Sequence, residues 1–201
     1  ITNNTEAILS GYWGTGNTIY TGASRYSLKD FKMGQYKFEM KNKVWNARVY
    51  TTQENAGQSF NLAATTQNYN ELWKPSTTWY PQYITTYLSG LMSGQVDSAA
   101  HARARIVADQ GRPALGSPQF KDMYNKVRRI PVPKGGGLLD RSDLWGIDGS
   151  YNLSEYTKSF ADVIVGGNWR KYLLDSDSTL FPDPVDKPIG ITEFGAYVQI
   201  T

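Results

Sequence analysis

Apolar and polar residues alternate along several short stretches of the chain. Because successive side chains of a β-strand point to opposite faces, such alternation predicts strands with one apolar face. The stretch YKFEMKNKVWNARVY places Tyr36, Phe38 and Met40 on one face, and Lys37 and Glu39 on the other. Its second half sets Trp45, Ala47, Val49 and Thr51 against Asn46, Arg48 and Tyr50. The polar residues Lys41, Asn42 and Lys43 between the halves predict a tight antiparallel hairpin.

Alternation returns near residue 143 and predicts a second hairpin. DLWGIDGSYNL puts Trp145, Ile147, Gly149, Tyr151 and Leu153 on one face, and ADVIVGGNWRKY does the same with Ala161, Val163, Val165, Gly167 and Trp169. The polar segment SEYTKS between them predicts a turn. At the end of the chain, ITEFGAYVQIT aligns Phe194, Ala196, Val198 and Ile200, which predicts half of a third pair.

Residues 57–141 lack this alternation and predict short helices. YPQYITTYLSGLMSG (80–94) has apolar residues at helical spacing. DSAAHARARIVADQG predicts a helix that Asp97 or Ser98 caps and that Gly111 and Pro113 end. SPQFKDMYNKVRR predicts a further helix, with Ser117 as N-cap, Pro118 at the first helical position and Arg128 and Arg129 at its end.

The lengths of the connections suggest what lies on the two faces of the strands. Short links at 41–43 and about 154–159 alternate with a very long one at 57–141 and a medium one at about 174–189. Outer-membrane β-barrels have tight turns at one rim, long loops at the other, and strands with an apolar lipid-facing side. A soluble sandwich or barrel gives the same alternation. The long excursion is unusual for a soluble domain and favours a functional surface loop.

Composition narrows the function classes. The net charge is +3 without a concentrated basic run, which argues against nucleic-acid binding, and the absence of cysteine excludes disulfides and Cys-ligated metals. No stretch approaches the ~20 continuous apolar residues of a membrane-spanning helix. The N-terminal residues lack a starting Met and the features of a secretory signal, so we expect the chain to be part of a longer protein.

The polar residues favour no enzyme. His101, the sole histidine, lies on an Ala-rich helix beside Arg103 and Arg105, where a solvated face is a simpler interpretation than a catalytic triad. Four carboxylates alternate along the predicted strands, as a polar lumen lining would, rather than forming a glycosidase pair: Glu39, Asp148, Asp162 and Glu193. We predict no catalytic residue, no cofactor and no resident metal.

Two other clusters leave alternatives open. The stretch DSDSTLFPDPVD (175–186) offers oxygen ligands for calcium, but it lacks the glycine of an EF-hand loop, which favours an exposed Asp/Pro loop. Arg103, Arg105, Arg128 and Arg129 either meet anionic lipids or a partner, or form solvated helix faces.

Aromatic residues of the helical segment are the candidate contacts with a ligand or partner. They lie among polar residues, and aromatic rings supply rigid contact area for recognition. The alternative is that they form the segment's own small core. The residues are Trp73, Trp79, Tyr80, Tyr83 and Tyr87.

Several stretches also resemble a known family. RYSLKDFKMGQYKFEMKNKVWNARVYTTQENAGQSF, AHARARIVADQGRPALGSPQF, LWGIDGSYNLSEY, VIVGGNWRKYLLDSDSTLF and ITEFGAYVQ are similar, in the same order, to segments of TonB-dependent outer-membrane receptors of Bacteroidota that carry a carboxypeptidase-regulatory-like domain. The resemblance runs from about residue 5 to the end. It implies a nutrient importer whose barrel is closed by a plug domain, although the chain contains no recognisable plug, TonB box or regulatory-like domain.

The resemblance and the pattern together predict one all-β domain with a helical insertion: part of a transmembrane β-barrel. We expect a hairpin at about 29–56, an extracellular helical loop at about 57–141, a hairpin at about 142–173, a loop at about 174–189 and a strand at about 190–201. The expected location is the bacterial outer membrane, with long loops extracellular. Expected partners are outer-membrane lipid, the TonB complex through other parts of the protein, and a surface lipoprotein or larger membrane assembly. The alternatives are a structural or interaction subunit of such an assembly, or a soluble β-rich binding module.

Overall fold

The chain forms two compact units in the computed structural model, which describes residues 4–157 and 161–201. One unit contains a β-sheet and comprises Ile1–Tyr20, Ser27–Ser59 and Leu138–Thr201 within the described residues. The other comprises Thr21–Tyr26 and Phe60–Gly137 and is mainly helical. Apart from Thr21–Tyr26, the helical unit therefore falls within the segment where the sequence loses its alternation.

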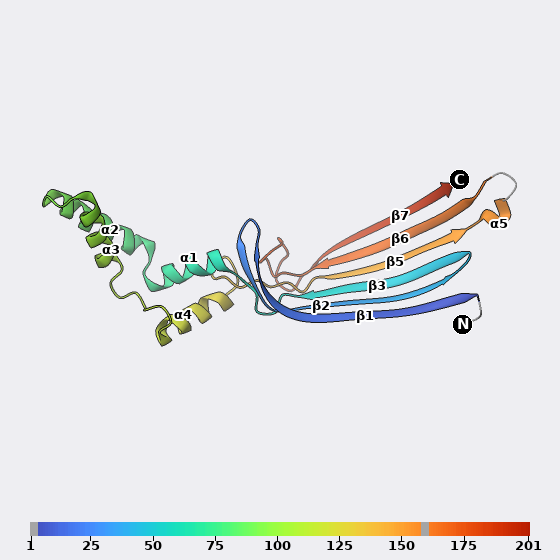
Figure 1. Ribbon diagram of the computed structural model, residues 1–201, viewed down its shortest axis with the longest axis horizontal. Coiled ribbons are helices and arrows are strands. Elements are labelled where there is room, and N and C mark those ends of the chain that lie inside the picture. Colours follow the sequence, from blue (N-terminus) through green and yellow to red (C-terminus); the bar gives the residue numbers. More distant parts are fainter. Residues whose placement is uncertain (1–3, 158–160) are drawn as a thin grey trace. The chain divides into compact units, whose positions relative to one another are not determined.

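The sheet unit is built from long strands that neighbour one another in chain order (Figure 1). The order is β1 (Thr5–Thr21), β2 (Arg25–Asn42), β3 (Trp45–Asn55), β5 (Asp143–Asn152), β6 (Val163–Leu174) and β7 (Ile189–Ile200). The short β4 (Phe60–Asn61) pairs with β2 off this path. The pairs from β2 to β7 are antiparallel, and the sheet is not closed into a barrel. The predicted antiparallel β architecture with a helical insertion is confirmed at this level.

The register confirms the predicted apolar face. Directly paired residues of an antiparallel sheet share a face. Phe38 pairs with Val49, Val49 with Ile147, Ile147 with Trp169, and Trp169 with Phe194, so one apolar row crosses five strands. These side chains are not packed into a sealed interior, since all but Trp169 are exposed.

The opposite face carries paired charges. Glu39 pairs in register with Arg48, and Arg48 with Asp148. Arg48 Nε lies 2.6 Å from Asp148 Oδ2, and Lys37 Nζ lies 2.8 Å from Glu39 Oε2. Glu193 accepts a hydrogen bond from the Tyr172 hydroxyl at 3.4 Å. The alternation of polar and apolar residues thus separates the two faces of one sheet.

Both predicted turns differ in detail from expectation. Strand β2 continues through Asn42, whose Oδ1 accepts hydrogen bonds from the backbone N–H groups of Val44 and Trp45, each at 2.8 Å. An asparagine that bonds its own downstream backbone stabilises a tight turn. Because β3 begins at Trp45, the reversal lies at 43–44, slightly later than the predicted 41–43. The link between β5 and β6 contains a short helix, α5 (Ser154–Thr157), rather than a plain turn. Residues 158–160 of this link lie outside the described residues.

The helical unit contains four longer helices. They are α1 (Leu62–Trp73), α2 (Ser76–Met92), α3 (Asp97–Ala108) and α4 (Pro118–Arg129). The Ser117 hydroxyl accepts a hydrogen bond from Phe120 N, and Pro118 occupies the first turn, as predicted. The expected cap of α3 was wrong, because Val96 stands at the N-cap and no side chain caps this end. No helix of the described residues is long and apolar enough to cross a membrane.

Helices α1 and α4 pack around a small core. Thr65 is fully buried and Tyr69 is 5% exposed, and the Tyr69 ring centroid lies 5.2 Å from that of Phe120. Three consecutive glycines, Gly135 to Gly137, run against α1. A Cβ at Gly136 would collide with Thr65 Oγ1, so the close approach of this segment to α1 requires glycine.

Helices α2 and α3 pack along a line of small residues, the alanine seam. It consists of Ala100, Ala104 and Ala108, each fully buried, four residues apart on one side of α3. Gly90 of α2 is also buried, and a Cβ there would lie 3.0 Å from Ala100 Cβ. Small side chains therefore let the two helix backbones approach closely.

Candidate functional site

A break in the chain between α1 and α2 positions two tryptophans. Lys74 precedes Pro75 and adopts an extended backbone, which ends α1 because a residue before proline disfavours the helical region. Trp73 is the last residue of α1, and Trp79 lies in the first turn and a half of α2. The two rings therefore flank the corner between the helices.

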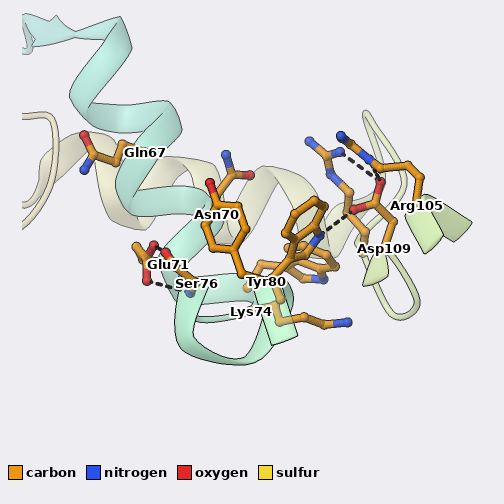
Figure 2. A pocket seen from close by; sticks show the side chains of 11 residues that line it. Gln67, Asn70, Glu71, Lys74, Ser76, Tyr80, Arg105 and Asp109 are labelled. Carbon is orange, nitrogen blue, oxygen red and sulfur yellow. Dashed lines mark hydrogen bonds and ion pairs between the residues drawn. The ribbon is translucent and has the colours of Figure 1, made fainter. Parts of the chain in front are cut away.

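This corner encloses a pocket of about 360 Å³, which we call the corner pocket (Figure 2). Residues of α1, of the corner itself, of α2, of the end of α3 and of the following loop line it. They are Gln67, Asn70, Glu71, Trp73, Lys74, Ser76, Trp79, Tyr80, Arg105, Asp109 and Arg112. Three of the five predicted contact residues are among them: Trp73, Trp79 and Tyr80.

Hydrogen bonds fix the walls of the corner pocket. Trp79 Nε1 donates to Asp109 Oδ1 at 2.9 Å, and Trp73 Nε1 donates to the Gly111 carbonyl at 2.8 Å. Lys74 Nζ donates to the Ala108 carbonyl at 2.5 Å. These bonds tie the corner to the end of α3. The pocket is thus held by polar contacts between residues thirty or more positions apart in the chain.

Asp109 stays ionised at the centre of this network. Arg105 Nε lies 2.6 Å from Asp109 Oδ2, and Arg112 Nη1 lies 3.9 Å from the same oxygen. Burial raises the pKa of Asp109, but the hydrogen bonds from Trp79 and Arg105 and the charges of both arginines outweigh burial, so the pKa lies below its usual value. One carboxylate therefore faces two guanidinium groups.

The other two predicted contacts, Tyr83 and Tyr87, do not line the corner pocket. Their rings continue a stacked column from Trp79, with centroids 5.1 Å apart for Trp79 and Tyr83 and 6.4 Å apart for Tyr83 and Tyr87. The His101 ring stacks 4.2 Å from Tyr87, and its Nδ1 lies 2.5 Å from the Tyr83 hydroxyl. Tyr83 and Tyr87 thus join α2 to α3.

His101 is partly exposed, but it is not simply a solvated residue on an open helix face. Its side chain is 47% exposed, and Nε2 lies 3.6 Å from Asp97. Tyr87 donates to Asp97 Oδ1 at 2.7 Å, and this hydrogen bond, followed by burial, raises the pKa of the Tyr87 phenol. The histidine therefore belongs to the contact between the two helices.

The predicted solvated arginines divide into different environments. Arg128 is only 8% exposed, because it lies over the Phe60 ring at 5.6 Å and its Nε donates to Asn125 Oδ1 at 2.8 Å. A solvated position was wrong for this residue. Arg103 and Arg129 are exposed, and Arg105 lines the corner pocket.

The acidic loop at 175–186 is largely exposed from residue 184 to 186, as expected, but it is organised around a buried carboxylate, which was not expected. Asp183 is fully buried and accepts hydrogen bonds from the backbone N–H and the hydroxyl of Ser176, each at 2.5 Å. Asp175 and Asp177 both pair with Arg141, at 3.1 and 2.9 Å. Among the described residues, no three His, Asp or Glu side chains are arranged to hold a metal ion.

Sequence reasoning missed the wall of the corner pocket that α1 supplies. Gln67, Asn70 and Glu71 precede Trp73 by six, three and two residues, so they reach the pocket only because α1 is a helix. A signal for this helix was present. Asn61 Oδ1 accepts from Ala64 N at 3.0 Å, and asparagine is a preferred N-cap residue.

Comparison with protein-family models, curated proteins and solved structures gave no match.

Proposed function

We propose that the chain forms part of the wall and one long outer loop of a TonB-dependent receptor in a bacterial outer membrane, and that it contributes to nutrient import. The observation that carries this proposal is the exposed apolar row from Phe38 to Phe194. Phe38 is 46% exposed, Ile147 is 50% exposed and Phe194 is 87% exposed. A continuous apolar face of this extent needs a nonpolar environment.

The opposite face supports the same proposal. Arg48, Asp148, Lys37 and Glu39 form ion pairs there, and such groups suit a water-filled lumen but not hydrocarbon. The links between β2 and β3 and between β5 and β6 are short, whereas the chain between β3 and β5 contains the whole run from α1 to α4 (Figure 1). Tight turns at one rim and long loops at the other are typical of outer-membrane barrels.

In a nutrient importer, the outer loops are the first part of the protein to contact the nutrient, so we place its recognition there. The corner pocket combines aromatic rings with charged and amide side chains, as ligand sites commonly do. In this proposal Trp73, Trp79 and Tyr80 contact the ligand, whereas Tyr83 and Tyr87 hold α2 against α3. The chain supplies no catalytic step.

Spin labels test the membrane environment of the sheet. The chain itself contains no cysteine, and any cysteine elsewhere in the intact protein is replaced by serine. Single cysteines are then introduced at Val49 and Ile147 on the apolar face and at Thr52 and Ser150 on the polar face, which gives a matched set. In vesicles, we expect labels at Val49 and Ile147 to collide with oxygen and not with a water-soluble nickel complex. Labels at Thr52 and Ser150 should instead collide mainly with the nickel complex. Equal access of the nickel complex to all four sites would contradict the proposal.

A second candidate is a structural or interaction subunit of an outer-membrane assembly. It is favoured by an uncharged helix face, since α2 exposes Tyr80, Ile84, Leu88, Leu91 and Met92. Growth of a deletion strain on single defined nutrients separates the two candidates. A growth defect on one nutrient supports import. Normal growth on every nutrient, with loss of a membrane complex, supports the structural role.

A further inference from the structure

The corner pocket carries more positive than negative charge. Its lining includes three cations, Lys74, Arg105 and Arg112, and two carboxylates, Glu71 and Asp109, which leaves a net charge of +1. Glu71 also accepts hydrogen bonds from the backbone N–H and the hydroxyl of the first residue of α2. The positive end of the α2 dipole therefore offsets part of the Glu71 charge.

Both arginines are held in place yet remain accessible. The Arg105 guanidinium lies 5.4 Å from the centroid of the Trp79 ring, and that of Arg112 lies 5.8 Å from the Trp73 ring. Stacking on an aromatic face orients a guanidinium group without using its N–H donors. Their side chains are 58% and 45% exposed. The pocket thus presents oriented donors to a solute.

An exposed ring lies near these donors. Tyr80 is 59% exposed, and its ring centroid lies 5.1 Å from that of Trp79, nearly perpendicular to it. Figure 2 shows Tyr80 beside Asn70 in the corner pocket, with Arg105 and Asp109 farther along the same hollow. A ligand with a flat body and one charged end fits this order of groups.

We propose that the corner pocket binds small organic carboxylates, with the carboxylate held by Arg105 and Arg112 and the body against Tyr80. A single negative charge matches the net charge of the lining. Planar guanidinium groups favour planar carboxylates through paired N–H donors. The proposal rests on the proposed function in one respect: it names the chemical class of the solute that the outer loop captures.

Calorimetric titration of the intact, detergent-solubilised protein tests the proposal with benzoate as the probe and benzamide as its uncharged counterpart. We expect benzoate to bind and benzamide not to bind, with the benzoate affinity falling as salt screens the arginines. Arg105→Gln and Arg112→Gln should each weaken benzoate binding about tenfold, because each removes a charge-assisted hydrogen bond. Arg103→Gln removes the same charge from an exposed position of α3 outside the pocket and should leave binding unchanged.

A second variant keeps the test informative if an arginine substitution disturbs the fold. Tyr80→Ala removes only the exposed ring, and it should weaken benzoate binding more than acetate binding. Absence of benzoate binding to the unaltered protein, equal binding of benzamide, or an equal loss in Arg103→Gln would overturn the proposal. Each of these results leaves the spin-label test of the sheet untouched. Conversely, benzoate binding in a protein whose sheet faces only water would reject the receptor and retain the carboxylate site.

Discussion

Asp183 illustrates how a single acidic residue organises a loop between two strands. Besides the two bonds from Ser176, the Ser178 N–H donates to Asp183 Oδ1 at 3.3 Å. Burial raises the pKa of Asp183, but the hydrogen bonds from Ser176 and from nearby backbone N–H groups outweigh burial and lower the pKa from 3.8 to about 2. Hydrogen bonds to the ionised form favour that form, so the carboxylate stabilises the loop while it is charged.

We predict that the loop at 175–188 loosens in acid. Because the pKa of Asp183 is lower in the folded state, its contribution is fully present above about pH 4 and is lost as the pH falls toward about 2. Asp183→Asn should loosen the loop even at pH 6, with about tenfold faster hydrogen exchange of the Ser176 and Ser178 amides. Mass spectrometry of peptides from the loop measures this exchange. Asp122→Asn, at an exposed position of α4, is the control and should change nothing.

At the residue scale, the sequence identified residue types better than environments. It located the acidic cluster, but nothing local distinguishes the buried Asp183 from its exposed neighbours, because burial depends on how the loop folds over Ser176. Arg128 was misjudged for the same reason, since the Phe60 ring that covers it is far away in the sequence. By contrast, Trp73, Trp79 and Tyr80 were found as a cluster because they are close along the chain.

At the scale of single elements, two helix starts of the helical unit offer a direct comparison. Helix α4 begins after Ser117, whose hydroxyl satisfies a free backbone N–H of the first turn. Helix α3 has Ser98 in its first turn, but Val96 occupies the N-cap position and makes no side-chain bond. The two serines are thus similar in sequence context and different in role.

We therefore predict different costs for the same substitution. Ser117→Ala should destabilise the helical unit by about 1 kcal/mol, the usual cost of losing an N-cap side chain. Ser98→Ala should be neutral or slightly stabilising, because alanine has the higher helix propensity. Thermal unfolding followed by helical circular dichroism measures both. A larger loss for Ser98→Ala than for Ser117→Ala would show that the assigned caps are wrong.

Elements with strong periodicity were predicted well, and those without it were missed. The faces of β2, β3, β5, β6 and β7 followed from alternation, because a strand has a period of two whatever it packs against. Strand β1 was not predicted, because its sequence contains Gly11, Gly14 and Gly16, and glycine disfavours strands. The strand forms by pairing with β2 and not because its residues have a high strand propensity. Helix α1 was hidden by its Thr and Asn residues, which are weak helix formers.

At the scale of the whole chain, the exposed apolar face and the ion-paired polar face need different surroundings. Val49 and Thr52 lie on the same strand, three residues apart, and face opposite sides of the sheet. The receptor proposal assigns hydrocarbon to Val49 and water to Thr52. A charge introduced at the two positions should therefore have different consequences.

We predict that Val49→Lys impairs insertion of the intact protein into lipid vesicles and that Thr52→Lys does not. A lysine on the lipid side near the middle of a bilayer costs about 2–4 kcal/mol, whereas a lumen position tolerates it. Folding titrations in urea with vesicles present measure the difference. Similar, small effects at both positions would contradict a lipid-facing side for this sheet.

The alanine seam between α2 and α3 has a consequence for how recognition can diversify. Ala100, Ala104 and Ala108 set the spacing of the helices, whereas Arg105, Asp109 and Tyr80 line the corner pocket. The residues that pack the helices and those that line the pocket therefore occupy separate positions of this part of the chain. Under the carboxylate proposal, a lineage could exchange the side chains that line the corner pocket, and with them the bound solute, while it inherits the same pair of packed helices.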